Sequence, residues 1–113
     1  MREIYFVLPP SLLLLDLAGP ADAFRVAAQL GADFRLNFVS ATAGVGTSLG
    51  LPLSGLSPLP ETLPDGALVV VPGSTPSEQA YATPDARRIV AWLAARRGQA
   101  GVRWAGICSG SLL

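Results

Sequence analysis

The chain has 113 residues, of which half are hydrophobic and 14% charged, so it fits one folded domain and is not a disordered chain. Eight arginines balance eight acidic residues, which leaves no basic surface for nucleic acid in this stretch. There is no histidine and only one cysteine, which excludes an internal disulfide and a Cys–His–acid triad.

The same composition predicts a cytoplasmic protein without a cofactor or a metal site. No apolar run approaches the roughly 18 residues that a membrane span requires, so no membrane association is expected. The apolar N-terminus loosely resembles a signal peptide, but Glu3, Pro9, Pro10 and Asp16 interrupt its apolar run, so secretion is not expected.

The first predicted unit is a strand followed by a helix. Residues 4–8 form a short apolar run that ends at two prolines, as in a central strand that is covered on both faces. Gly19 and Pro20 predict a helix entry with proline at the first helical position, and Gly31 predicts its end. Between them, apolar residues recur at helical spacing: Ala21, Phe24, Ala27, Ala28 and Leu30.

A second strand is predicted over residues 35–40 and the clearest strand over residues 67–71. Residues 43–60 are rich in glycine and proline and predict a small hairpin or an irregular excursion. Thr83, Pro84 and Asp85 predict the start of a second helix, which Gly98 ends. Its apolar face is predicted from the spacing of Ala86, Ile89, Val90 and Leu93.

The last strand is predicted over residues 102–107. Strands that alternate with helices over this length predict an α/β fold, a parallel sheet with helices on both faces. In such sheets ligands bind at the carboxyl ends of the strands, where Asp16, Gly73 and Cys108 are expected to converge.

Cys108 follows the last strand within Gly106-Ile-Cys-Ser-Gly110 and precedes an apolar run. This order is typical of a nucleophile elbow, in which small flanking residues allow a tight turn and the next helix begins at once. The N–H groups of that helix would favour the thiolate. The alternative is that Cys108 is a small, inert residue of the core. Ser109 and Ser111 are interpreted as residues of the helix start.

Asp16 is the only charge in an apolar neighbourhood, and two interpretations stay open. It could cap a helix, or a buried, protonated carboxyl could donate a hydrogen bond to a thiolate at Cys108. Gly73 either belongs to an ordinary turn or, with the N–H of Ser109, forms an oxyanion pocket, with Ser74 beside it.

Three segments, 15–20, 69–73 and 105–113, resemble in order and spacing the ThiJ/PfpI superfamily, which is class I glutamine amidotransferase-like. The chain looks most like the sensor domain that precedes a helix-turn-helix module in AraC-family transcriptional regulators of the GlxA/FtrA type, and next most like isonitrile hydratases. The resemblance implies a flavodoxin-like fold with Cys108 in the elbow, Asp16 facing it, and Gly73 with Ser109 lining the pocket. Ser74 stands where the family usually has a second glycine.

The resemblance also implies partners and a choice of functions. A sensor domain would bind a small molecule, often nitrogen-containing, would dimerise, and would reach DNA only through a downstream domain. A hydratase would use Cys108 and Asp16 as catalytic residues, and a structural or dimerising domain would need neither. Since the sequence gives the predicted last helix only five residues after Cys108, the chain is expected to be the N-terminal part of a longer protein.

Overall fold

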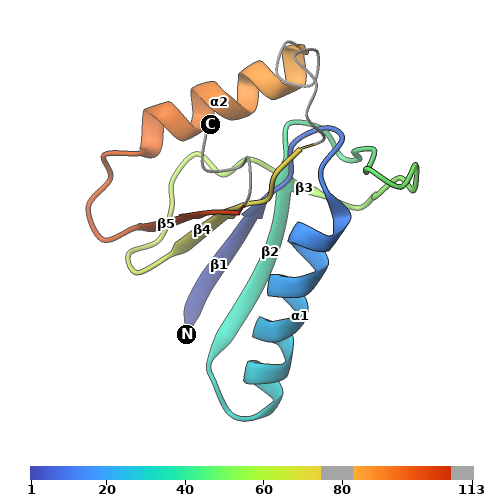
Figure 1. The fold of residues 1–113 in the computed structure, drawn as a ribbon. Helices are drawn as coiled ribbons and strands as arrows, with labels where there is room; N and C mark the ends of the chain where they lie inside the picture. The colour runs from blue at the N-terminus through green and yellow to red at the C-terminus, as the bar shows by residue number, and fades with distance from the viewer. Residues whose placement is uncertain (75–82, 108–113) are drawn as a thin grey trace.

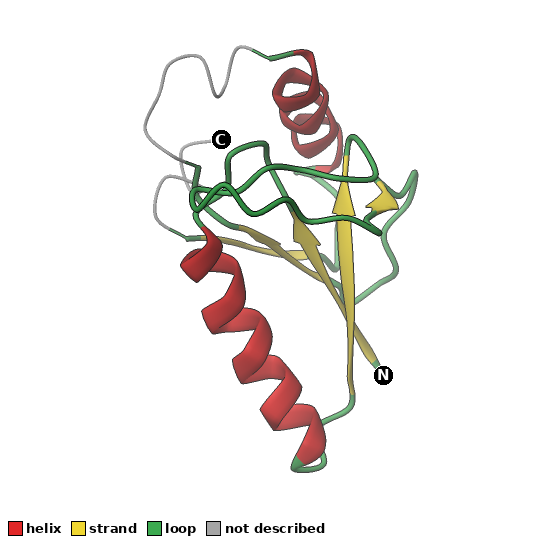
Figure 2. Cartoon of the chain, turned by 90° about the vertical axis from the view of Figure 1, so that its right-hand side faces the viewer, coloured by secondary structure: helices red, strands yellow, loops and turns green. Residues whose placement is uncertain are grey.

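The computed structural model describes residues 1–74 and 83–107, and within them the chain forms a parallel five-stranded sheet with one helix on each face (Figures 1 and 2). The strand order is β3-β2-β1-β4-β5. The elements are β1 (Arg2–Val7), α1 (Leu14–Gln29), β2 (Phe34–Ser40), β3 (Ser57–Pro58), β4 (Leu68–Val71), α2 (Pro84–Arg96) and β5 (Arg103–Gly106). The predicted α/β fold class is therefore confirmed.

The predicted central strand, β1, lies in the middle of this sheet and pairs in parallel with β2 and β4. Ile4, Phe6 and Val7 are fully buried, because α1 covers one face of β1 and α2 the other. Since adjacent residues of a strand point to opposite faces, β1 contributes to two separate cores.

The core under α1 is aromatic. The ring of Phe6 is stacked on that of Phe38 with 5.4 Å between centroids, and Phe24 of α1 meets Phe34 edge-on at 5.3 Å. The core under α2 contains mainly valine and leucine side chains together with Ile89 and Trp92. These buried surfaces fix both helices to the sheet.

The predicted start of the first helix is wrong. α1 begins at Leu14, so Pro20 lies inside the helix instead of at its first position. Proline has no N–H and cannot donate to the carbonyl of Asp16 four residues earlier. The apolar face of Leu17 and Phe24 packs on the sheet across this interruption, which outweighs the local preference of proline for a helix start.

The second helix begins as predicted. The Oγ1 of Thr83 accepts a hydrogen bond from the N–H of Ala86 at 3.2 Å, and Pro84 is the first helical residue. One residue of its predicted apolar face is misplaced: Val90 is 38% exposed, whereas Trp92 is buried and donates from Nε1 to the carbonyl of Pro60 at 2.6 Å.

The excursion over residues 43–60 contains the predicted small hairpin. Val45 and Leu53 exchange backbone hydrogen bonds of 2.9 and 2.8 Å across an isolated antiparallel bridge. Sequence reasoning missed β3, which follows the hairpin and pairs with Val39 and Ser40 at the end of β2. No helix in the described ranges is both long enough and apolar enough to cross a membrane.

Candidate functional site

Hydrogen bonds join the segment that follows β1 to the segment that follows β4. The N–H of Leu13 donates to the carbonyl of Gly73 at 2.8 Å, and Leu12 forms an isolated antiparallel bridge with Ser74. The Oγ of Ser74 donates to the carbonyl of Pro10 at 3.2 Å. These contacts hold the segment between β1 and α1 against the end of β4.

The carboxyl end of β5 lies beside the same place. The N–H of Ile107 donates to the carbonyl of Val71 at 3.0 Å, two residues before Gly73. Cys108 is the next residue in the sequence, but it lies outside the described residues, as do Ser109, Ser111 and the predicted elbow with its helix. Their predicted roles stay predictions.

This edge of the sheet is also where the topology reverses. From β1 the chain passes through α1 to β2 on one side, and β4 passes through α2 to β5 on the other. Open α/β sheets bind ligands in the crevice at such a reversal. Asp16, Gly73 and the strand that leads to Cys108 are thus placed at the position where this architecture binds ligands.

Asp16 is the third residue of α1, with its Oδ2 atom buried. It is not the N-cap residue, because Leu13 occupies that position and provides no side-chain cap. A carboxylate at the third position can still accept from the N–H of the N-cap residue, as in a capping box. Here that N–H donates to Gly73, and the N–H of Leu14 donates to Ser48 Oγ at 3.3 Å. The two amides that open α1 thus bind groups other than the Asp16 carboxylate.

Gly73 and Ser74 are both buried, Ser74 with 2% of its surface exposed. The Gly73 carbonyl and the Ser74 hydroxyl both bond to the segment that leads into α1. Their observed contacts therefore position that segment, and the predicted oxyanion role of Gly73 would rest on its N–H group.

Two residues near this site were not singled out from the sequence. Ser48 binds the start of α1 from the excursion, where its N–H also donates to the carbonyl of Leu12 at 2.8 Å. Ser11 has a φ of 57°, the left-handed region that residues other than glycine seldom adopt. In the sequence, Ser48 is marked only by its position in a glycine-rich stretch, and Ser11 only by its position after two prolines.

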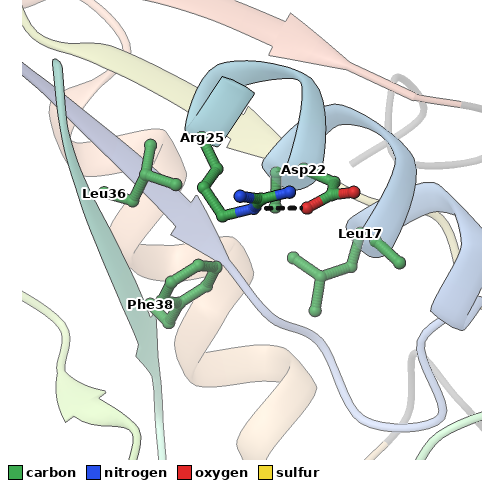
Figure 3. A pocket seen from close by; sticks show the side chains of 7 residues that line it. Leu17, Asp22, Arg25, Leu36 and Phe38 are labelled. Atoms are coloured by element: carbon green, nitrogen blue, oxygen red, sulfur yellow. Dashed lines mark hydrogen bonds and ion pairs between the residues drawn. The ribbon is translucent and has the colours of Figure 1, made fainter. Parts of the chain in front are cut away.

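A shallow groove of about 370 Å³ lies elsewhere, between α1 and β2 (Figure 3). Leu36 and Phe38 line it from β2, and Leu17 lines it from α1. Over it, the Nε of Arg25 donates to Asp22 Oδ1 at 2.7 Å, and this bond holds the pKa of the Asp22 carboxyl below its ordinary value. Asp16, Gly73 and Ser74 do not line this groove, so it is separate from the predicted site.

Within residues 1–74 and 83–107, no three or more acidic, cysteine or histidine side chains gather where they could hold a metal ion.

The strand order β2-β1-β4-β5, with one crossover helix on each face and the short β3 added at the edge, defines a flavodoxin-like α/β protein. Solved structures with a similar fold include a ThiJ/PfpI family protein and two related chains. An AraC family transcriptional regulator from Pseudomonas putida matches with a TM-score of 0.70 and 24% identity. A ThiJ/PfpI family protein from Pseudomonas syringae matches with a TM-score of 0.74 and 22% identity. Oxidized DJ-1 from Toxoplasma gondii matches with a TM-score of 0.63 and 20% identity.

Each match covers nearly all of this chain: 98% for the regulator, 97% for the ThiJ/PfpI family protein and 96% for DJ-1. Each covers a smaller share of the matched chain, which is 58%, 43% and 56% respectively. The chain therefore spans about half the length of these three matched chains. No family model and no curated protein sequence matches it. The predicted resemblance to the ThiJ/PfpI superfamily is confirmed at the level of the fold.

Proposed function

We propose that this chain is the ligand-sensing, ThiJ/PfpI-like domain of an AraC-family transcriptional regulator. In this proposal a small, nitrogen-containing metabolite binds at the carboxyl edge of the sheet around Cys108. The protein is cytoplasmic and reaches DNA only through a downstream domain.

One observation carries the proposal: the 2.8 Å bond between Leu13 and Gly73 joins the segment that carries Asp16 to the end of β4. Beside it, β5 leads straight to Cys108. A carboxylate, backbone amides and a thiol from three separate segments would then share one cleft. Few polar groups at an otherwise apolar edge are typical of small-molecule sites. The similarity to the P. putida regulator, which extends over almost the whole chain, supports the regulatory context.

Within the cleft each residue has a proposed part. The Asp16 carboxyl exchanges a hydrogen bond with the Cys108 sulfur or with the ligand. The N–H groups of Gly73 and Ser109 bind an electron-rich atom of the ligand. Ser74 lines the pocket beside Gly73, and its hydroxyl holds the Pro10 segment in place.

Amide chemical shifts in a two-dimensional NMR titration test the location of the site. The probes are small amides, nitriles and isonitriles, added to the ¹⁵N-labelled protein. The proposal predicts shifts at Leu13, Asp16, Gly73 and Ser74, and an Asp16→Ala variant should weaken them. The matched variant Asp22→Ala, on the same helix but over the separate groove, should leave them unchanged. Shifts confined to Leu36 and Phe38 in that groove, or no shifts at all, would contradict the proposal.

A second candidate, an isonitrile hydratase, is favoured by the buried Oδ2 of Asp16 at the edge that leads to Cys108. The sulfur would add to the isonitrile carbon while that carbon gains a proton, which gives a thioimidate. Water would then add to the same carbon and the thiol would leave. The net reaction converts R–NC and water into the formamide R–NH–CHO, and Asp16 would transfer the protons.

Mass spectrometry of the protein incubated with an alkyl isonitrile separates the two candidates. A formamide whose formation is abolished by Cys108→Ala and strongly slowed by Asp16→Asn, but not by Asp22→Asn, would establish the hydratase. Binding without turnover would favour the sensor. Two helix-turn-helix patterns encoded after Leu113 would favour the sensor independently.

A further inference from the structure

The outer edge of β2 is only partly covered by another strand. β3 pairs with Val39 and Ser40 at the end of β2, whereas residues 34–38 pair only with β1, on their other side, in the described part of the chain. The residue before β3, Leu56, donates its N–H to the carbonyl of Ala43 and not to β2. We call the uncovered side of residues 34–38 the open β2 edge.

The open β2 edge presents the backbone groups of Leu36 and Phe38. The carbonyls of Asp33 and Val39 accept hydrogen bonds of 2.8 and 2.9 Å from the β1 side, so the odd-numbered residues between them direct their N–H and C=O groups toward β1. Because these groups alternate in direction along a parallel strand, those of Leu36 and Phe38 point outward. Unpaired edge groups of this kind form a template for another strand.

The side chains of Leu36 and Phe38 line the groove between α1 and β2 (Figure 3). Ala18, Asp22 and Arg25 line it from α1. The Asp22 carboxylate and the Arg25 guanidinium bind each other at 2.7 Å, so their charges compensate on this face. A strand added along the open β2 edge places every second side chain on this face, where the groove favours apolar groups.

The opposite face of the open β2 edge carries the positive charge of Arg35. Its side chain is 63% exposed, and among the described residues its guanidinium donates only from Nη1, to Glu3 Oε1 at 3.3 Å. The other Glu3 oxygen accepts from Asn37 at 2.9 Å. Arg35 therefore keeps N–H donors for a further carboxylate. On this face the side chains of an added strand lie beside Arg35, because residues paired across two strands share a face.

We propose that the open β2 edge binds an extended segment of a partner protein in which apolar and acidic residues alternate. The backbone of the segment pairs with Leu36 and Phe38, as in other complexes formed by strand addition. Its apolar side chains enter the groove, and its carboxylates bind Arg35. This edge runs along the side of the sheet and not across the carboxyl ends of the strands, so the proposal does not depend on the function proposed above.

Hydrogen exchange and NMR titration with the peptide acetyl-Val-Glu-Val-Glu-Val-amide test this proposal. In the free protein the amides of Leu36 and Phe38 should exchange quickly, whereas those of Arg35 and Asn37 are protected by β1. The peptide should slow exchange at Leu36 and Phe38 and shift their signals. Control peptides with the order Val-Val-Glu-Glu-Val, or with lysine in place of glutamate, should bind about tenfold more weakly or worse.

Two pairs of variants test the groove and the charge separately. Ala18→Trp fills the groove and should raise the dissociation constant of the peptide about tenfold or more. Ala23→Trp, at an exposed position of α1 outside the groove, should leave it unchanged. Arg35→Gln should remove the preference for glutamate over lysine, whereas Arg97→Gln, at an exposed position beyond α2, should preserve it.

Three results would overturn the proposal. The first is a peptide that leaves exchange at Leu36 and Phe38 unchanged. The second is equal binding of the glutamate and lysine peptides by the parent protein. The third is slow exchange of both amides before any peptide is added, which would mean that the protein's own chain or a second copy already covers the open β2 edge.

Discussion

Replacing Ser74 by alanine tests how the candidate site is held together. Ser74 is 2% exposed, and its hydroxyl donates to the Pro10 carbonyl at 3.2 Å, across 64 residues of sequence. A hydrogen bond of this kind contributes about 0.5–1.5 kcal/mol to folding. Only one atom is removed, so the added cost of a cavity is small. We therefore expect the free energy of unfolding to fall by about 1 kcal/mol, which lowers the Tm by about 4 °C for a chain of this size.

Urea unfolding followed by tryptophan fluorescence measures this loss. The control is Thr42→Ala, which removes a 2.8 Å bond from Thr42 Oγ1 to the Gly44 carbonyl within one exposed loop. Thr42→Ala should lower the free energy of unfolding by less than about 0.5 kcal/mol, as is usual for surface substitutions. If Ser74→Ala costs no more than Thr42→Ala, the Ser74 hydroxyl does not hold the segment before α1, and our account of this edge is wrong.

Three other predictions follow from the described contacts. Thr83→Ala should lower the free energy of unfolding by about 1 kcal/mol, since it removes the cap that accepts from Ala86, and Thr83→Ser should restore most of the loss; equal losses would argue against capping. Phe6→Ala should cost about 3–5 kcal/mol, since Phe6 is fully buried, and a cost near 1 kcal/mol in urea unfolding would contradict the aromatic core. In an NMR titration the Asp22 carboxyl should have a pKa below its ordinary value, and Arg25→Gln should raise that pKa. Because folding lowers the pKa of Asp22, the ion pair stabilises the folded state above the ordinary carboxyl pKa, and this stabilisation is lost as the pH falls through the lowered pKa. An Asp22 pKa that does not respond to Arg25→Gln would refute the pairing.

Most of the fold was predictable because it depends on local signals that agree with one another. The β-branched run before Pro72 becomes a buried strand, and the order Thr83-Pro84-Asp85 becomes a capped helix start. The parallel sheet then follows from the alternation of strands and helices. In each case the local preference and the tertiary packing favour the same structure.

The errors arise where tertiary contacts override a local signal. Pro20 favours a helix start, yet Leu17 and Phe24 pack on the sheet as parts of one continuous helix. Val90 was predicted to be buried from its spacing but is 38% exposed, whereas Trp92 is buried and donates to the carbonyl of Pro60. No period in the sequence reveals these contacts, because their partners lie about 30 residues away or in another element.

For the candidate site, the sequence predicted which segments meet but not how they are joined. The convergence of Asp16 and Gly73 at one edge follows from the parallel topology alone. The bond between Leu13 and Gly73 and the role of Ser48 depend on the path of two irregular segments, which residue preferences do not determine.

We propose that the segment before α1, the end of β4 and Cys108 form one cleft. The rate at which Cys108 reacts with iodoacetamide, measured against pH in the parent protein, Asp16→Asn and Asp22→Asn, tests it most directly. If these parts form one cleft, the midpoint of this reaction lies below the ordinary thiol pKa of about 8.5, shifts in Asp16→Asn and does not shift in Asp22→Asn. A midpoint at or above about 8.5 that neither substitution changes would contradict it.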